Sequence, residues 1–318
     1  MPMSETRENI HRFAGPEDAG DRAWDMPQLL AALRRARSST VRMHDEGVHE
    51  QPAPETVTEI VHDLRAALFP QHFGAADGAA ADLDVFVCNR LDSSLRALQQ
   101  QVRRCLRPAC SQGVATLKAR EMITEFASAL PQIRYVLEMD LSAAYAGDPA
   151  ASSRSEVLLC YPGVRAVFYH RVAHELYRLG VPLLPRMMSE LAHSLTGIDI
   201  HPGAQIAECF FIDHGTGVVI GETAVVGKRV RLYQGVTLGA SRFLVGADGG
   251  LVKGQPRHPI IEDDVVIYAG ATVLGRITIG RGETIGGNVW VTQSVAPWSR
   301  ITQGKVRHED MFMGGAGI

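Results

Sequence analysis

Hydrophobic residues in the first 195 positions recur every three to four residues. Leu29, Leu30 and Leu33 form the first apolar stripe, in a stretch that begins at Met26. This spacing places the apolar side chains on one face of an α-helix. The same spacing predicts further helices over residues 56–68, 82–106, 115–130, 132–145, 164–179 and 183–195. We therefore predict a flexible N-terminus over residues 1–23 and a helical domain over residues 24–196.

From residue 200 onward the hydrophobic period changes to six. One aliphatic series begins at Ile200 and steps by six, and the period returns at Ile261 after an interruption. Of the 31 glycines, 21 lie in residues 200–318, often directly after the aliphatic residue. A period of six fits a triangular prism in which each side uses one hexapeptide and glycine permits the corners. We predict such a coiled domain over residues 197–299 and a C-terminal tail over residues 300–318.

The six-residue period resembles that of the hexapeptide-repeat proteins, which fold as a left-handed parallel β-helix and include many acyltransferases. The predicted fold class is therefore α + β, with a helical N-terminal domain followed by a left-handed β-helix. The resemblance implies a homotrimer with clefts between the prisms, and the helical domain is expected to pair two trimers. Residues 241–256 interrupt the repeat, so we expect a loop that leaves the prism as a flap at the cleft.

Composition and charge exclude several classes of protein. The chain carries 32 Lys and Arg against 35 Asp and Glu, a net charge of −3, which argues against a broad nucleic-acid-binding surface. It has no apolar run long enough to span a membrane. The start of the chain lacks an apolar signal core, and the five cysteines form no regular framework. These features predict a cytoplasmic protein with reduced thiols.

One histidine stands where the aliphatic series predicts an apolar residue. His214 is in phase with Ile220, which suggests either a functional role or a local change of phase. Asp199 precedes it by 15 residues, a little less than one coil of 18. An imidazole has the pKa needed to accept a hydroxyl proton near neutrality, and a carboxylate can orient it. We predict a His214–Asp199 general-base pair, with a purely structural histidine as the alternative.

Six stretches of the chain resemble the serine O-acetyltransferases, in particular the subgroup with a long helical N-terminal region. The stretches are Asp148-Pro-Ala, Tyr169-His-Arg-Val-Ala-His-Glu-Leu-Tyr, Gly197-Ile-Asp-Ile-His-Pro-Gly, Ile212-Asp-His-Gly-Thr-Gly-Val-Val-Ile-Gly-Glu-Thr-Ala-Val, Gln234-Gly-Val-Thr-Leu-Gly and Arg257-His-Pro.

The resemblance implies that the chain moves an acetyl group from acetyl-CoA to the hydroxyl of L-serine. The product, O-acetylserine, is a precursor of cysteine. The family's general base and its partner match His214 and Asp199, and no metal is implied. The substrate-binding positions of the family match Asp148, Asp213, Arg257 and His258. The positions along the acetyl-CoA arm match Gly239, Ala240, Ala269, Gly270 and Gly287.

Three alternatives remain open at this point. The first is an acetyltransferase of the same fold that acts on homoserine or another small hydroxyl acceptor. The second is a metal-dependent hexapeptide protein such as a γ-type carbonic anhydrase, with His201, His214 and His258 as ligands. The third is a non-catalytic regulator that uses only the tail. The chain ends in Gly317-Ile318, which resembles family tails that insert into O-acetylserine sulfhydrylase, so this enzyme is a predicted partner.

Overall fold

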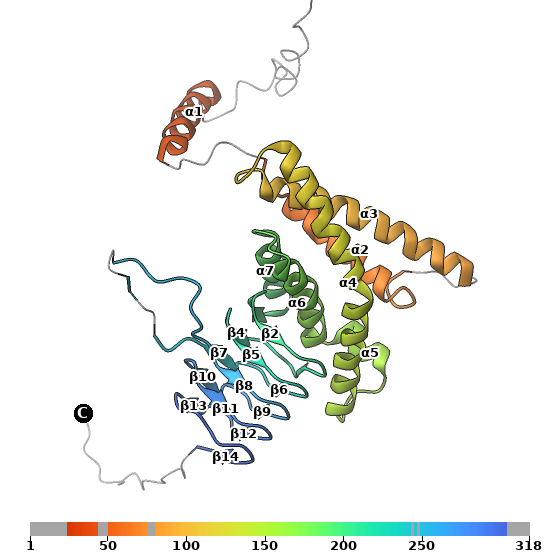
Figure 1. The fold of residues 1–318 in the computed structure, drawn as a ribbon, viewed down its shortest axis with the longest axis vertical. Helices are drawn as coiled ribbons and strands as arrows, with labels where there is room; N and C mark the ends of the chain where they lie inside the picture. Colours follow the sequence, from red (N-terminus) through yellow and green to blue (C-terminus); the bar gives the residue numbers. More distant parts are fainter. Residues whose placement is uncertain (1–23, 44–49, 75–79, 243–244, 247–248, 304–318) are drawn as a thin grey trace, which may run out of the picture. The chain divides into compact units, whose positions relative to one another are not determined.

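The computed structural model describes residues 24–43, 50–74, 80–242, 245–246 and 249–303 (Figure 1). The chain divides into two compact units, one up to Glu50 and one from Gln51 onward. Within the described residues, the first unit holds helix α1 (Met26–Met43), whose predicted apolar stripe is exposed. No helix in the described residues is long and apolar enough to cross a membrane. The helices of the second unit are α2 (Pro54–Leu68), α3 (Ala80–Leu106), α4 (Gln112–Gly147), α5 (Arg154–Cys160), α6 (Pro162–Arg178) and α7 (Leu184–Thr196).

One pair of predicted helices is in fact a single helix. The sequence suggested a break between residues 130 and 132, but α4 runs through Pro131. Proline lacks the N–H that continues a helix, so it often ends or kinks one. Here Phe126 and Leu130 before it and Ile133 and Leu137 after it are all buried. Continuous burial of one helix face outweighs the single missing hydrogen bond.

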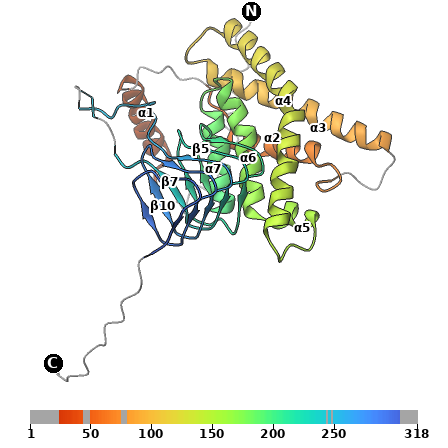
Figure 2. The same ribbon diagram turned by 60° about the horizontal axis from the view of Figure 1, so that its bottom comes forward.

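The strands of the second half form three parallel sheets that make the sides of a prism (Figures 1 and 2). The predicted α + β fold class with its parallel β-helix is confirmed. Sheet 1 contains β1 (Asp199–Ile200), β4 (Val219–Ile220), β7 (Thr237–Gly239), β10 (Thr272–Leu274) and β13 (Trp290–Val291). Sheet 2 contains β2 (Gln205–Ile206), β5 (Val225–Val226), β8 (Ile260–Ile261) and β11 (Thr278–Ile279). Sheet 3 contains β3 (Phe211–Ile212), β6 (Arg231–Leu232), β9 (Val266–Ile267), β12 (Thr284–Ile285) and β14 (Arg300–Ile301).

The second residue of each short strand points into the prism. Ile200, Ile220, Leu238 and Val273 lie in register along sheet 1 and are all buried. Stacking these side chains from coil to coil gives the prism a continuous apolar core. Three lines of corners join the sheets. Corner 1–2 comprises residues 201–204, 221–224, 240–242, 249–259 and 275–277. Corner 2–3 comprises residues 207–210, 227–230, 262–265 and 280–283, and corner 3–1 comprises residues 213–218, 233–236, 268–271 and 286–289.

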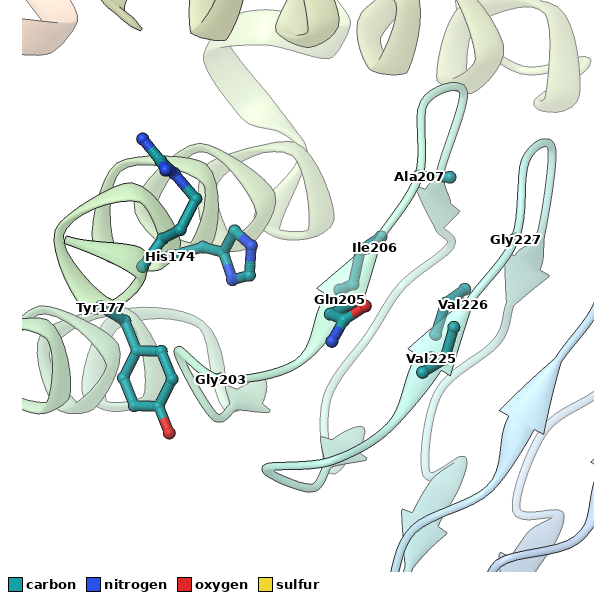
Figure 3. Close-up of a pocket in the computed structure, with 10 residues that line it drawn as sticks. His174, Tyr177, Gly203, Gln205, Ile206, Ala207, Val225, Val226 and Gly227 are labelled. Carbon is teal, nitrogen blue, oxygen red and sulfur yellow. The ribbon is translucent and has the colours of Figure 1, made fainter. Parts of the chain in front are cut away.

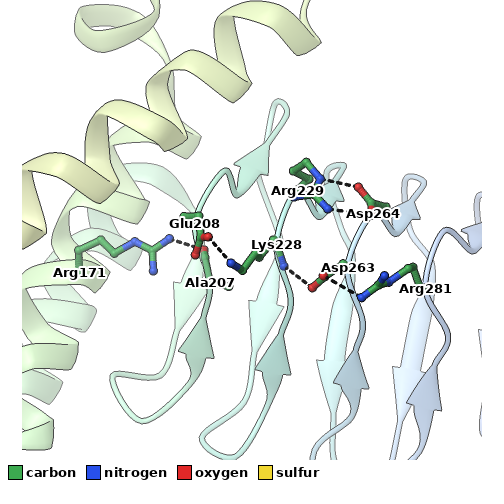
Figure 4. A network of polar contacts seen from close by, with 8 residues as sticks. All are labelled: Arg171, Ala207, Glu208, Lys228, Arg229, Asp263, Asp264 and Arg281. Carbon is green, nitrogen blue, oxygen red and sulfur yellow. Dashed lines mark hydrogen bonds and ion pairs between the residues drawn. The ribbon is translucent and has the colours of Figure 1, made fainter.

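Oppositely charged residues from successive coils alternate along corner 2–3 (Figure 4). The Lys228 ammonium lies 2.7 Å from Glu208, and the Lys228 backbone N–H donates to Asp263 at 2.9 Å. Asp263 in turn pairs with Arg281 at 3.2 Å. These exposed pairs contribute little each, but the alternation avoids like charges on neighbouring coils. Corner 2–3 is therefore a structural edge whose charges are already matched.

A nearly buried ion pair joins the helices to the first coil of the prism. Arg171 on α6 donates to both carboxylate oxygens of Asp140 on α4, at 3.1 and 3.2 Å. The same guanidinium donates to the carbonyl oxygens of Ile206 and Ala207, and the Phe210 N–H donates to Asp140 at 2.9 Å. This network ties α4 and α6 to the turn between β2 and β3.

The Asp140→Ala substitution should lower the free energy of unfolding by about 3–5 kcal/mol, because it leaves a buried guanidinium without a counter-ion. Urea unfolding followed by circular dichroism measures the effect. Asp92→Ala is the matched control, since Asp92 pairs with Arg96 on the exposed face of α3. That control should not move the unfolding midpoint. Equal midpoints for the two variants would contradict the structural role of the buried pair.

Candidate functional site

The corner that holds His214 is wider than a regular corner. Asp199 pairs with Val219, 20 positions later, whereas Val219 pairs with Thr237 after the regular 18. The two extra residues fall in the turn between β3 and β4, and they lift His214 out of the inward column. Its side chain is 72% exposed. His214 therefore does not occupy an inward aliphatic position, and the local change of phase that the sequence left open is present. The imidazole faces solvent, where a substrate can reach it.

The backbone of this turn is left-handed at two consecutive residues. His214 has φ of 57° and Gly215 has φ of 91°. Such values are uncommon for residues other than glycine, and they mark a turn that its surroundings hold in place. A Cβ at Gly215 would lie 2.4 Å from Ile198 Cδ1, so only glycine lets the turn pack this closely on the previous coil. The turn thus presents His214 from a rigid base.

Asp213, the neighbour of His214, is already paired with a cation. Its Oδ1 lies 3.9 Å from His214 Nδ1, and its Oδ2 accepts a hydrogen bond from Arg231 Nη2 at 2.8 Å. The Arg231 guanidinium also lies over the Phe211 and Tyr233 rings, 5.0 and 4.7 Å from their centroids. These contacts hold Arg231 in place, so it offsets the charge of Asp213.

Asp148 lies at the end of α4 and accepts hydrogen bonds from two neutral donors. The Tyr161 O–H donates to Oδ2, and the Ala150 N–H donates to Oδ1 at 2.8 Å. The Tyr161 hydrogen bond is the main cause that lowers the pKa of Asp148 below its ordinary value. The same bond raises the pKa of Tyr161 to about 12. The sequence analysis missed Tyr161, because nothing in its local pattern indicates a contact with a residue 13 positions earlier.

Asp199 does not contact His214 in the described part of the single chain. Its carboxylate lies 3.6 Å from Arg186 Nη1. The two residues nevertheless belong to neighbouring segments. His214 lies in the turn that contains Gly217, and Asp199 follows Gly197 by two residues. The Gly217 N–H donates to the Gly197 carbonyl at 2.8 Å and joins these segments. The His214–Asp199 pair remains a prediction.

Arg257 and His258 lie at corner 1–2, where the chain returns from the loop over residues 241–256. The Thr223 hydroxyl oxygen accepts the backbone N–H groups of Arg257 and His258, at 2.9 and 3.2 Å. The Arg257 Nη2 lies 2.7 Å from Glu222 Oε2. One threonine of the preceding coil thus fixes the returning backbone, and Glu222 orients the guanidinium.

The His258 imidazole is buried and held by hydrogen bonds. Its Nδ1 accepts the Thr223 N–H at 3.0 Å. A Cβ at Gly221 would lie 2.0 Å from His258 Cδ2, so the ring packs directly on the glycine backbone. Burial is the main cause that lowers the pKa of His258 to about 4, and the nearby Arg257 charge adds to it. His258 is therefore a neutral imidazole at physiological pH.

The predicted site residues form two groups on different corners of one chain. The acidic half-site, at corner 3–1, consists of Asp148, Asp213 and His214. The basic half-site, at corner 1–2, consists of Arg257 and His258. Sheet 1 separates these corners, so one chain does not bring the two half-sites together. The predicted acetyl-CoA positions divide in the same way, with Ala269, Gly270 and Gly287 at corner 3–1 and Gly239 and Ala240 at or beside corner 1–2.

The three histidines of the carbonic anhydrase alternative also divide between these corners. His201 shares corner 1–2 with His258, whereas His214 lies at corner 3–1. In the described ranges, no group of three or more His, Cys, Asp or Glu side chains is arranged to hold a metal ion.

A groove of about 640 Å³ lies between α6 and sheet 2 (Figure 3). Its walls include His174 and Tyr177 from α6 and Ile206 and Val226 from the sheet. None of the predicted site residues lines it. The groove nevertheless adjoins the basic half-site, because the Tyr177 hydroxyl donates at 3.4 Å to Glu222, the partner of Arg257.

Comparisons with known proteins give a consistent result, although no family model matches the chain. The chain is 51% identical over 307 residues to a protein of Synechococcus elongatus named "Serine acetyltransferase, plasmid", which covers 93% of this chain and 96% of that protein. The structure of serine acetyltransferase 1 from Entamoeba histolytica in complex with L-cysteine matches with a TM-score of 0.69 and 38% identity, over 80% of this chain and 88% of that one. Serine acetyltransferase from Neisseria gonorrhoeae in complex with serine matches with a TM-score of 0.52 and 30% identity, over 77% of this chain and 95% of that one.

The depressed pKa of His258 predicts that its imidazole stays neutral as the pH falls from 7 to about 5. Between about pH 6.5 and 4 the unfolded chain binds a proton there that the folded chain does not, so this group reduces stability as the pH falls through that range. NMR titration of the ring nitrogens measures this, with the His258→Gln variant to assign the signal. A His258 signal that titrates near pH 6.5 would contradict the assignment.

Proposed function

Because this chain belongs to the serine acetyltransferase family, which makes it an acyltransferase, we propose that it transfers the acetyl group of acetyl-CoA to the hydroxyl of L-serine. The observation that carries the proposal is the exposed His214, held by a left-handed turn beside two carboxylates. An exposed imidazole on a rigid turn suits proton transfer to and from a bound substrate.

The proposed mechanism needs one general base and no covalent intermediate. His214 accepts the proton of the serine hydroxyl as that oxygen attacks the thioester carbonyl. The oxyanion that forms needs N–H donors, which the glycine-rich turns of the prism supply. His214 then donates the proton to the departing thiolate, which returns the imidazole to its starting state.

The proposed orientation of L-serine follows from the charges of the two half-sites. Asp148 receives the ammonium group of the substrate. The Arg257 guanidinium receives its carboxylate, for which a planar fork of donors is suited. Glu222 pairs with Nη2, whereas among the described residues Nη1 makes only a long hydrogen bond of 3.4 Å to the Gln255 carbonyl oxygen, which a substrate carboxylate can replace. His258 contributes a neutral imidazole to the same half-site, and Asp213 lies beside the base.

The proposed site is completed between two copies of the chain. In a cyclic trimer, corner 3–1 of one copy faces corner 1–2 of the next, so each interface joins an acidic to a basic half-site. This arrangement accounts for the separation of the two half-sites in the described part of the single chain. We extend the proposal to a homotrimer, or a dimer of trimers paired through the helical domain.

Asp199 keeps its proposed role as the partner of His214. The His214 side chain is largely exposed and is free to turn about its side-chain bonds. Because Asp199 flanks the same corner, such a rotation brings the imidazole toward its carboxylate. The carboxylate would then exchange its 3.6 Å contact with Arg186 for one with the imidazole.

The small residues at the corners suit the proposed acetyl-CoA arm. A Cβ at Gly270 would lie 2.3 Å from Asn288 Oδ1, and one at Gly287 would lie 3.1 Å from the Ala269 carbonyl oxygen. The close packing of successive coils therefore requires small residues at some of these positions, whether or not a ligand binds there. The same lack of side chains lets an extended ligand approach the backbone closely between two prisms. Binding of acetyl-CoA along this edge is part of the proposal.

The proposed partner O-acetylserine sulfhydrylase depends on residues that lie outside the described ranges. The tail over residues 304–318, with Ile318, is among them. The sulfhydrylase contact therefore rests on the resemblance of the terminal Gly317-Ile318 pair alone.

A thiol-release assay with acetyl-CoA and a panel of acceptors tests the proposed function. We expect turnover with L-serine and much lower turnover with L-homoserine and with sugars. His214→Ala should lower kcat by about 10²- to 10⁴-fold, because it removes the base. The control is His193→Ala, an exposed histidine on α7 that should leave kcat unchanged. Turnover of L-serine by His214→Ala at the wild-type rate would refute the mechanism.

Co-expression of His214→Ala with Arg257→Ala tests whether the site lies between copies. Each variant alone lacks one half-site at every interface. In random mixed trimers, about a quarter of the interfaces combine two intact half-sites, so activity should recover to about a quarter of wild type. The two variants mixed after assembly, without exchange of subunits, are the control and should stay inactive. No recovery in verified mixed trimers would place the complete site within one chain.

A further inference from the structure

The two carboxylates beside His214 have different kinds of partner. Asp213 is paired with the Arg231 guanidinium at 2.8 Å. In the described residues, Asp148 accepts hydrogen bonds from the Tyr161 O–H and the Ala150 N–H and forms no ion pair. Neither donor carries a charge, and the Arg231 cation, which also acts on Asp148, is paired directly with Asp213 instead. A cationic group that enters this half-site is attracted mainly to Asp148.

The backbone on either side of Tyr161 is fixed. Tyr161 ends α5 and precedes α6, with φ of −80° and ψ of 120°. Its N–H donates to the Val157 carbonyl, and its own carbonyl accepts the Arg165 N–H, both at 3.2 Å. Pro162 follows it, and proline restricts the residue before it to extended conformations. The Tyr161 side chain therefore projects from a junction with little freedom.

Two glycines hold both ends of the Tyr161–Asp148 contact against strand β3. A Cβ at Gly163 would lie 2.1 Å from the Ile212 carbonyl oxygen, so α6 begins in direct contact with the residue before Asp213. A Cβ at Gly147 would lie 3.0 Å from the Phe211 ring, so the end of α4 rests on the same strand. The Tyr161 side chain thus links the start of α6 to the end of α4, and both helix ends pack against β3.

We propose, on the premise of the proposed function, that Tyr161 is a positioning residue for the amino-acid acceptor. Its O–H holds the Asp148 carboxylate in the orientation that receives the substrate ammonium. The other charged or titratable groups near this contact are Glu156, Asp213, His214 and Arg231. Arg231 and His214 lower the pKa of Asp148 without a direct hydrogen bond to it, whereas Glu156 and Asp213 are carboxylates of like charge. The Tyr161 O–H is neutral and in direct contact, so it orients the carboxylate without cancelling its charge.

Steady-state kinetics of Tyr161→Phe test the proposal, since this substitution removes only the hydroxyl. We expect KM for L-serine to rise about five- to tenfold, while kcat and KM for acetyl-CoA stay within about twofold. Inhibition by 3-hydroxypropionate, which keeps the hydroxyl and carboxylate of serine but lacks the ammonium, should be unchanged. Tyr135→Phe, an exposed tyrosine on α4, is the matched control and should leave every constant unchanged.

A double-mutant cycle with Asp148→Asn separates positioning from general damage to the fold. If Tyr161 acts through Asp148, the double variant should have the same KM for L-serine as Asp148→Asn alone. Additive effects, an unchanged KM in Tyr161→Phe, or an equal weakening of 3-hydroxypropionate would each overturn the proposal. Failure of the wild-type protein to acetylate L-serine would instead refute the proposed function, and with it the premise of this inference.

Discussion

The inward aliphatic column of the prism is the constraint on which the rest of the site depends. Its members, such as Ile220 and Leu238, must fall in register from coil to coil, so each regular coil has 18 residues. Any additional residue has to leave the column at a corner. The chain adds residues at two corners that carry the candidate chemistry: two in the turn of His214, and a longer insertion before Arg257. Functional groups are thus placed where the core tolerates insertion.

The contact between the helices and the first coil also sets the positions of residues outside the prism. The Asp140–Arg171 network fixes α4 and α6 to the first coil. Because α4 ends at Gly147 and α6 begins at Pro162, the same docking sets the positions of Asp148 and Tyr161. The acidic half-site therefore combines a turn of the prism with the end of a helix, and loosening the helices should alter substrate binding as well as stability.

The sequence predicted the elements well and the contacts poorly, for physical reasons. The six-residue period is a local signal, and it specified the sheets, the coil length and the position of the long insertion. The period drew attention to His214, but it cannot distinguish a replaced core residue from a widened corner, and the structure shows the widened corner. Glu283 shows the converse case: it does occupy an inward position, fully buried, with a hydrogen bond from Ser299. The Tyr161–Asp148 contact depends on how two helix ends dock, which no local pattern encodes.

The division of the site between two corners also has an electrostatic consequence. Within one chain, Asp213 is paired with Arg231 and Arg257 with Glu222, so both half-sites carry their own counter-ions before any assembly. Had Asp148 and Arg257 shared one corner, they would neutralise each other and compete with a zwitterionic substrate. Among the described residues, their separation by sheet 1 leaves Asp148 without a direct ion pair, as its proposed role toward the ammonium requires, and leaves Arg257 Nη1 with only a 3.4 Å hydrogen bond to the Gln255 carbonyl oxygen. In the proposed site between two copies, the spacing between these charges is set by how the prisms pack. The α-ammonium and α-carboxylate are equally far apart in serine and in a longer hydroxy amino acid, so in the proposed site the side-chain length is selected by the reach from the two charged contacts to His214, where only one length places the hydroxyl at the imidazole.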